Sequence, residues 1–301
     1  MRPASLLPLV LALALGACAT QRESTKVTLP VTQTAVAHVE ANPGADDNLN
    51  AVLWTQASAE YDAAALSLYR AAADRLDEAL ADPAWDALAP GERDNAAALA
   101  GLPPAVIMDV DETVLDNSPY QARLVRQGAT YDEASWAAWV DERAARPVPG
   151  VAEFTRAAAT RGVTVVYLSN RTEQSQAATL DNLRALGLPV AGGDAFLGKG
   201  SAGCEHAGSA KDCRRRQVAA RYRVLMQFGD QLGDFVAVRD GAPAARQALV
   251  ERHAGWFGER WWMLPNPTYG DWEPALFGHD WDLAPAARRA AKRAALDTGA
   301  P

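Results

Sequence analysis

The amino-acid sequence predicts an α/β protein with a doubly wound parallel sheet and a smaller helical cap subdomain. Short apolar runs at 105–108, 163–168 and 224–228 alternate with segments of helical periodicity, which is typical of strands joined by helices. The first run has no polar face, as expected of a strand covered on both sides. Each run leads into polar residues, so we expect a ligand site where the carboxyl ends of the strands meet.

The helices follow from spacing and from residues that stop them. Apolar residues recur at helical spacing from Asn48 to about Leu80, which predicts one long amphipathic helix ended by Asp82-Pro83. The segment 118–150 is expected to be a helical insertion that closes in a turn. The remaining expected elements are a helix at 154–160 ended by Gly162, a helix ended by Gly187, a short strand at 195–197, a basic helix at 211–222, an edge strand at 261–264 and a helix from Ala286 onward with Pro285 just before it.

The N-terminal segment is a targeting signal rather than part of the fold. Arg2 supplies a positive charge, residues 6–15 are apolar and small residues follow, in a run too short to span a membrane. Leu-Gly-Ala-Cys at 15–18 resembles the lipobox of bacterial lipoproteins, in which the cysteine is acylated. This resemblance implies lipidation of Cys18 and an outer-membrane anchor facing the periplasm, because Ala19 rather than aspartate follows. An ordinary secretory signal that contains a cysteine is the alternative.

The chain of 301 residues, with 49% hydrophobic content, is long enough to bury a sizeable core. Its net charge of -8 argues against a nucleic-acid polymer as partner, but allows a small anionic substrate. The expected organisation is a signal peptide at 1–17, a tether at 18–44, a helical subdomain from 45–100 and 118–150, a core from 101–117 and 151–284, and a C-terminal helix and tail at 285–301.

Two cysteines remain if Cys18 carries lipid. In an oxidising compartment Cys204 and Cys213 are expected to pair, and the bond would pin a polar loop close to Lys211. A zinc site made by Cys204, His206 and Cys213 is the alternative, although a four-ligand spacing is lacking.

Acidic residues mark the expected site. Asp109 and Asp111 follow the first strand, and residues i and i+2 of an extended segment point the same way. The alternative for this pair is a solvated turn. Polar residues also follow two other strands, namely Ser169, Asn170, Asp230 and Asp234. Ser169 could instead be a helix N-cap, the commoner task of a serine between a strand and a helix.

Four motifs in order resemble those of the haloacid dehalogenase (HAD) superfamily. They are Asp-Val-Asp-Glu-Thr at 109–113, Ser-Asn-Arg at 169–171, Lys211 with Arg214, and Gly-Asp-Gln-Leu-Gly-Asp at 229–234. Residues 111–120, the Trp136/Trp139 segment and 264–273 are similar to the class C acid phosphatase lipoproteins of bacteria. The resemblance spans residues 45–280 and implies a HAD-like phosphatase core with broad activity on phosphate monoesters, including nucleoside 5'-monophosphates, as in a 5'-nucleotidase.

Hydrolysis of a phosphate monoester needs a nucleophile in line with the leaving oxygen and a group that protonates this oxygen. We assign these roles to Asp109, which would form an aspartyl-phosphate, and to Asp111. Because the nucleophile and the phosphate repel each other, a cation is required, and Mg²⁺ prefers oxygen ligands. Asp230 is an expected metal ligand, and the resemblance implies Asp109 and the backbone carbonyl of Asp111 as further ligands. Asp234 either binds the metal, directly or through water, or orients Lys211.

Lys211 is expected to stabilise charge on the transferring phosphoryl group. Lys199 is a rival, but Lys211 matches the family's Lys-x-x-Arg pattern. The Cys-flanked loop before Lys211 departs from that family. The arginines at 214, 215, 216, 221 and 223 are interpreted mostly as a solvated helix face, with pairing to an acidic motif residue as the alternative for Arg214.

Residues expected to bind substrate are Ser169, Asn170, Thr113 and Tyr269. Tyr269, Trp136 and Tyr120 are candidates to stack on a flat leaving group, with a core position as the alternative for each. A second hypothesis for the whole protein is a non-catalytic periplasmic lipoprotein that binds haem or nucleotides. The physiological substrate, the pH optimum and the oligomeric state, including a homo-oligomer, stay open.

Overall fold

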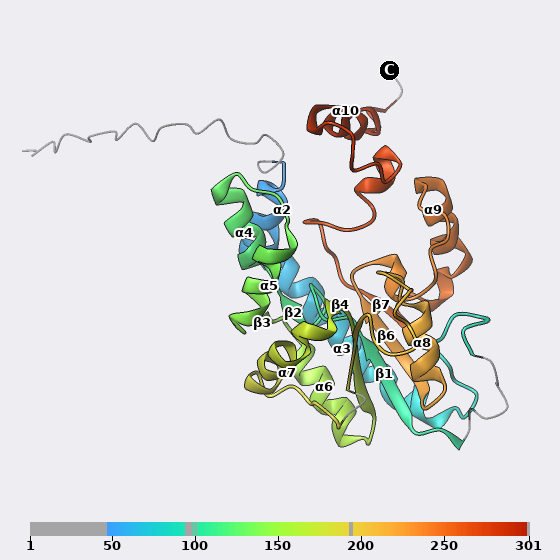
Figure 1. Ribbon diagram of the computed structural model, residues 1–301. Coiled ribbons are helices and arrows are strands. Elements are labelled where there is room, and N and C mark those ends of the chain that lie inside the picture. The colour runs from blue at the N-terminus through green and yellow to red at the C-terminus, as the bar shows by residue number, and fades with distance from the viewer. Residues whose placement is uncertain (1–46, 94–98, 100, 193–194, 300–301) are drawn as a thin grey trace, which may run out of the picture. The chain divides into compact units, whose positions relative to one another are not determined.

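A computed structural model describes residues 47–93, 99, 101–192 and 195–299. The helices are α2 (Leu49–Ala57), α3 (Ala59–Ala81), α4 (Ser118–Gln127), α5 (Glu133–Asp141), α6 (Val151–Thr160), α7 (Gln176–Ala185), α8 (Asp212–Ala219), α9 (Pro243–Arg252) and α10 (Pro285–Ala294) (Figure 1). The strands are β1 (Pro104–Met108), β2 (Leu115–Asp116), β3 (Arg146–Pro147), β4 (Thr164–Thr172), β5 (Phe196–Lys199), β6 (Arg223–Gly229) and β7 (Trp261–Met263). Short 3-10 helices are η2 (Glu173–Ser175), η3 (Leu232–Asp234), η4 (Ala254–Trp256) and η5 (Pro274–Phe277).

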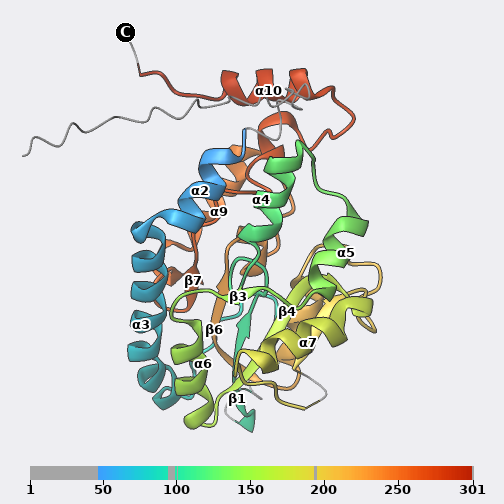
Figure 2. The ribbon, with the colours of Figure 1, turned by 90° about the vertical axis from the view of Figure 1, so that its left-hand side faces the viewer.

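Five strands form one parallel sheet in the order β5-β4-β1-β6-β7, which confirms the predicted fold class. The buried side chains of β1 alternate between two apolar clusters. Val106 and Met108 pack with residues of α3 and α6, whereas Ala105 and Ile107 pack with residues of α8. Accordingly α3, α6 and α7 cover one face of the sheet and α8 lies on the other (Figure 1, Figure 2). The central strand is therefore buried on both faces, as its apolar sequence predicts.

The expected single helix from Asn48 to Leu80 is wrong, because the chain breaks at Ser58. Ser58 has extended backbone angles, and its hydroxyl accepts a hydrogen bond of 3.1 Å from the backbone N–H of Tyr61, which makes it the N-cap of α3. Helix α2 contacts α4, whereas α3 packs against α6 and β6. The two halves of the predicted helix thus have different partners, and the boundaries of the helical subdomain stay a prediction.

The interpretation of the arginines as a solvated face is wrong for three of the five. Arg214, Arg215 and Arg223 are buried. Arg223 donates hydrogen bonds of 2.6 to 3.1 Å to the backbone carbonyls of Ala79, Leu80 and Asp82 at the end of α3. A guanidinium at this place satisfies carbonyls that have no partner within the helix and complements its negative end. Burial is possible because the planar fork finds acceptors for its N–H groups.

Helix α10 begins at Pro285, one residue before the predicted start at Ala286, and has no buried residue. Arg289 forms an ion pair with Asp47, and Lys292 donates a hydrogen bond of 2.9 Å to Glu273. These contacts join the C-terminal helix to the start of the described chain and to the loop after β7. Within the described residues, no helix combines the length and the apolar character needed to cross a bilayer.

Candidate active site

Asp109, Lys211 and Asp234 form a buried ionic group at the carboxyl end of the sheet. Asp109 directly follows β1, and its backbone N–H donates to the carbonyl of Phe228 on β6 at 2.9 Å. The Nζ atom of Lys211, the residue that caps the start of α8, donates to Oδ1 of Asp109 and, at 2.6 Å, to Oδ1 of Asp234. The structure thus brings the predicted nucleophile and the predicted lysine into direct contact.

Asp230 follows β6 and completes a group of three carboxylates. Oxygen atoms of Asp109, Asp230 and Asp234 all lie within 4.8 Å of one another. Oδ2 of Asp230 accepts hydrogen bonds from the side-chain amides of Asn266, at 2.8 Å, and Gln231, at 2.7 Å. These bonds fix the orientation of Asp230 toward the two other aspartates.

The negative charge of these carboxylates favours the binding of a cation. Burial raises the pKa of Asp109 well above its ordinary value, the charge of Lys211 opposes this shift, and the other aspartates add to it. Burial and the charge of Asp234 raise the pKa of Asp230 to about 7. Burial opposes the charge on Lys211, but its two carboxylate partners prevail and raise its pKa. Three buried carboxylates lie together and the ammonium of Lys211 pairs with two of them, so the all-oxygen donor set fits a hard divalent cation.

The side chain of Asp111 is not in that group. Its Oδ1 atom accepts hydrogen bonds of 2.9 Å from Asn117 and from Nε of Arg171, and its Oδ2 atom accepts one of 3.3 Å from the hydroxyl of Ser169. Metal binding through the Asp111 side chain is therefore not supported. The metal contact that the family resemblance implies for Asp111 would use its backbone carbonyl instead. The carboxylate lines the cavity together with Asp109, which suits a proton donor and acceptor.

Arg171, Asn117 and Trp139 lie in segments that the sequence analysis named, but it gave them no role in the site. Arg171 is buried, forms an ion pair with Asp111 and donates to Oδ1 of Asn117 at 3.2 Å. Asn117 also accepts a hydrogen bond of 2.8 Å from the indole N–H of Trp139 on α5. These bonds connect Asp111 to the helical insertion. The Ser-Asn-Arg motif named Arg171, but no local pattern indicated its partner.

Among the predicted substrate-binding residues, two face inward. Ser169 and Thr113 are fully buried and do not line the cavity. Strand β4 runs through Ser169 to Thr172, so Ser169 is not a helix N-cap; its hydroxyl accepts from the backbone N–H of Arg171 at 3.0 Å. Thr113 lies 3.5 Å from Asp230 through its hydroxyl. Both support carboxylates, whereas the exposed Asn170 does line the cavity and accepts from Arg214 at 2.7 Å.

Tyr269 is held by a glutamate that the sequence reasoning overlooked. The Tyr269 hydroxyl donates to Oε2 of Glu112, and the backbone N–H of Asn117 donates to Oε1 of Glu112 at 2.8 Å. Burial, and then the charge of Asp111, raise the pKa of Glu112 to about 8. Glu112 also has a φ of 57°, a left-handed conformation that few non-glycine residues adopt. The carboxyl thus connects the loop after β1 with the loop after β7.

The other predicted aromatic residues occupy different positions. Trp136 lines the cavity and has the Arg171 guanidinium 5.5 Å from its ring centroid. Tyr120 is buried and does not line the cavity; its ring packs edge-on against that of Trp136, with the ring centroids 5.1 Å apart. The exposed Tyr131 lines the cavity instead, with its ring centroid 6.4 Å from that of Trp136. Stacking on a substrate is therefore open to Trp136 and Tyr269, but not to Tyr120.

A fully buried ion pair supports the backbone next to Asp234. Arg215 bonds both carboxylate oxygens of Glu92, at 2.6 and 2.7 Å. Its remaining nitrogen donates to the backbone carbonyls of Gly233, at 2.7 Å, and Asp234, at 3.1 Å. The pair therefore fixes η3, the short 3-10 helix that ends at Asp234.

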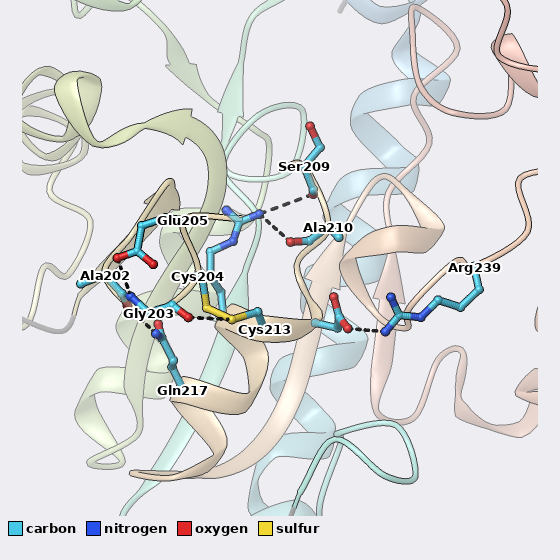
Figure 3. Close-up of a disulfide and its surroundings, with 11 residues drawn as sticks. Ala202, Gly203, Cys204, Glu205, Ser209, Ala210, Cys213, Gln217 and Arg239 are labelled. Carbon is cyan, nitrogen blue, oxygen red and sulfur yellow. Dashed lines mark hydrogen bonds and ion pairs between the residues drawn. A yellow bond between two sulfur atoms is a disulfide. The ribbon is translucent and has the colours of Figure 1, made fainter. Parts of the chain in front are cut away.

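Cys204 and Cys213 are joined in a disulfide (Figure 3). Because the bond uses both sulfur atoms, no thiolate remains for the alternative zinc site with His206. Cys18, by contrast, lies outside the residues that the structure describes.

The cavity over these groups has a volume of about 2120 Å³ and is lined by the catalytic candidates, by Lys199 and by residues of α10. Lys199, the rival of Lys211, reaches this cavity but makes no ion pair with Asp109 or Asp234. Such a volume exceeds that of most small-molecule sites. The space is sufficient for a phosphate with a large leaving group.

The site places buried carboxylates around an ammonium at the carboxyl edge of a parallel sheet. This arrangement is suited to the hydrolysis of phosphate esters. Comparison with known proteins then gives the family. Residues 11–272 match the model of the HAD superfamily, subfamily IIIB (acid phosphatase). The chain belongs to this family and is a phosphomonoesterase, which confirms the predicted family and enzyme class.

Solved structures agree with this assignment. The chain is similar to the class C acid phosphatase from Bacillus anthracis, at 32% identity and a TM-score of 0.73, over 85% of this chain and 99% of that one. The Bacillus anthracis class C enzyme with tungstate bound gives 31% identity and a TM-score of 0.74, with the same coverage of both chains.

Proposed function

We propose that this phosphomonoesterase is a Mg²⁺-dependent acid phosphatase that transfers the phosphoryl group to Asp109. The observation that carries the proposal is the buried contact of Lys211 with Asp109 and Asp234, beside Asp230. A haem or nucleotide carrier would not need a nucleophile next to a proton donor, which counts against that alternative.

In this proposal Asp109 attacks the phosphorus atom, the ester bond breaks and an aspartyl-phosphate forms. Asp111 gives its proton to the leaving oxygen and later takes one from the water that hydrolyses the aspartyl-phosphate. The hydrogen bonds from Asn117, Arg171 and Ser169 support this role, because they hold the Asp111 carboxyl in one orientation at the cavity.

The proposed metal ligands are Asp109, Asp230 and the backbone carbonyl of Asp111. A bound Mg²⁺ supplies the positive charge that offsets repulsion between Asp109 and the phosphate. Lys211 donates hydrogen bonds toward the same place and stabilises negative charge on the phosphoryl oxygens. Asp234 accepts from Lys211 and, at 2.8 Å, from the backbone N–H of Gln231, which supports an orienting role.

We further propose nucleoside 5'-monophosphates as one substrate class. Trp136 and Tyr269 line the cavity and are both placed to contact a flat leaving group. A panel of nucleotides, sugar phosphates and aryl phosphates tests this point. Equal kcat/KM for all three classes, in the wild type and in Tyr269→Ala, would contradict a stacking role.

The enzymatic proposal is tested with para-nitrophenyl phosphate across a pH series. We expect turnover that depends on added Mg²⁺ and that falls by more than about 10³-fold in Asp109→Asn. Asp271→Asn is the matched control, because Asp271 lines the same cavity but lies outside the carboxylate group. Wild-type protein without turnover at any pH would favour the carrier alternative.

The anchor is a separate proposal, in which lipid on Cys18 holds the protein in the outer membrane facing the periplasm. Cys18→Ser is expected to move the protein from the membrane fraction to the soluble periplasmic fraction, and to remove labelling by a radioactive fatty acid. A chain that stays in the membrane fraction after this substitution would refute lipidation at Cys18. Gel filtration of the unlipidated protein decides whether it forms a homo-oligomer.

A further inference from the structure

Lys211 reaches the active site from the end of a loop that has no regular secondary structure. The loop joins β5 to α8 and consists of successive turns. Its backbone hydrogen bonds run from Cys204 to Ser201 at 2.9 Å, from Ala207 to Cys204 at 3.0 Å and from Ala210 to Ala207 at 3.1 Å. Each of these bonds closes a single four-residue turn, so within the loop the backbone hydrogen bonds are local and its path depends on contacts with other elements.

Besides the hydrogen bonds of Arg214 to the carbonyls of Ser209 and Ala210, a disulfide and a further hydrogen bond attach this loop to α8. The disulfide links Cys204, which is buried, to Cys213 in the first turn of α8 and two residues after Lys211 (Figure 3). The side chain of Gln217, one turn further on, donates to the carbonyl of Ala202 at 2.6 Å. The disulfide is covalent and lies close to Lys211 in the chain. It therefore limits where the start of α8, and the lysine that caps it, are placed.

The position of Lys211 matters because its ammonium contacts two carboxylates at once. A displacement of about 1 Å in a reacting group can lower a rate by about 10²-fold. We propose that the Cys204–Cys213 disulfide positions Lys211 for phosphoryl transfer, so that a dithiol reductant lowers the phosphatase activity of the folded enzyme. This inference rests on the role proposed above for Lys211.

The redox step involves one bond. A dithiol attacks the Cys213 sulfur, which is more exposed than that of the buried Cys204, and the S–S bond breaks. Two electrons and two protons pass from the reductant, so that both cysteines end as thiols and the reductant ends as its own disulfide. Arg214 limits the resulting displacement, because its guanidinium donates to the carbonyl of Ala210 at 3.2 Å and to that of Ser169. The expected effect is thus partial.

The test compares kcat and KM for para-nitrophenyl phosphate in the presence of Mg²⁺ at 25 °C. The samples are the oxidised wild type, the wild type reduced with dithiothreitol and then alkylated, and Cys204→Ser/Cys213→Ser. We expect kcat to fall by about tenfold in the last two, with a smaller change in KM, because Lys211 acts on the transferring group. Dithiothreitol should have no effect on the double variant. Gln217→Ala, which removes the hydrogen bond to Ala202 and keeps the disulfide, should stay within about twofold of wild type.

Circular dichroism of the same samples separates positioning from folding. Reduced wild type that keeps its spectrum while its kcat falls supports the proposal, even if the double variant does not fold. An unchanged kcat after complete reduction overturns it. Loss of the folded spectrum on reduction also overturns it, because the bond then maintains the fold rather than the position of Lys211. Turnover by the oxidised wild type shows independently that the proposed phosphatase function holds.

Discussion

Glu112 offers a direct test of the electrostatics of the site. Its carboxyl is 3% exposed and accepts hydrogen bonds from Tyr269 and from the backbone of Asn117. Burial, and then the nearby charge of Asp111, raise its pKa from 4.5 to about 8. Near pH 7 the folded protein therefore keeps this carboxyl protonated, whereas the unfolded chain does not.

The sign of the effect on stability follows from this difference. As the pH rises from 4.5 toward 8, the unfolded chain releases a proton that the folded protein keeps, so the free energy of unfolding falls. One pKa unit corresponds to about 1.4 kcal/mol, and the shift from 4.5 to about 8 gives an upper limit of roughly 5 kcal/mol. Glu112→Gln removes the titration and keeps an oxygen that accepts. We expect the variant to gain a few kcal/mol over wild type at pH 8 and almost nothing below pH 4.5.

Calorimetric Tm values of the metal-free proteins, measured from pH 4.5 to 8, test this prediction. In a domain of this size 1 kcal/mol corresponds to about 2–4 °C, so the difference in Tm should reach several degrees at pH 8. Glu60→Gln, on an exposed part of α3, is the control and should show no such trend. A difference in Tm between Glu112→Gln and wild type that does not change with pH would refute the reasoning.

Three further substitutions test two buried hydrogen-bonded contacts and one titrating group. Tyr69→Phe leaves the buried carbonyl of Thr113 without its 2.7 Å hydrogen bond and should lower the free energy of unfolding by about 1–3 kcal/mol in urea titration; a neutral result would contradict the assigned contact. Glu92→Gln leaves Arg215 buried without a counter-charge and should lower the free energy of unfolding by about 3–5 kcal/mol, again in urea titration. A decrease of less than about 1 kcal/mol would contradict a stabilising role of this ion pair. Burial, and then Arg252, lower the pKa of His253, so the stability it contributes is present above pH 6.5 and is lost as the pH falls. His253→Asn should therefore reduce the fall in Tm between pH 7 and pH 5, and an unchanged fall would count against this assignment.

The sheet and the carboxylates could be predicted from local sequence, because a buried strand and its terminal residues are adjacent in the chain. Asp109 follows β1 and Asp230 follows β6, and parallel strands bring such residues to one edge. The break at Ser58 was not predicted, because the apolar spacing continues across it while one hydroxyl supplies the cap of a new helix.

Long-range polar contacts set the limit of the prediction. Arg215 looks like part of a solvated basic helix, but its partner Glu92 lies 123 residues away in the sequence. The hydrogen bond of Tyr269 with Glu112 spans 157 residues and depends on a left-handed residue after Asp111. Neither spacing nor composition contains that information.

Residues of α10 line one side of the cavity, so the width of the cavity is expected to depend on the ionic strength. This helix has no buried residue, and partly exposed ion pairs join Arg289 to Asp47 and Lys292 to Glu273. Dissolved salt screens such pairs, whereas the enclosed pair of Arg215 with Glu92 is largely protected. Concentrated salt should consequently loosen this side of the cavity and admit bulkier esters, while the catalytic carboxylates remain in place.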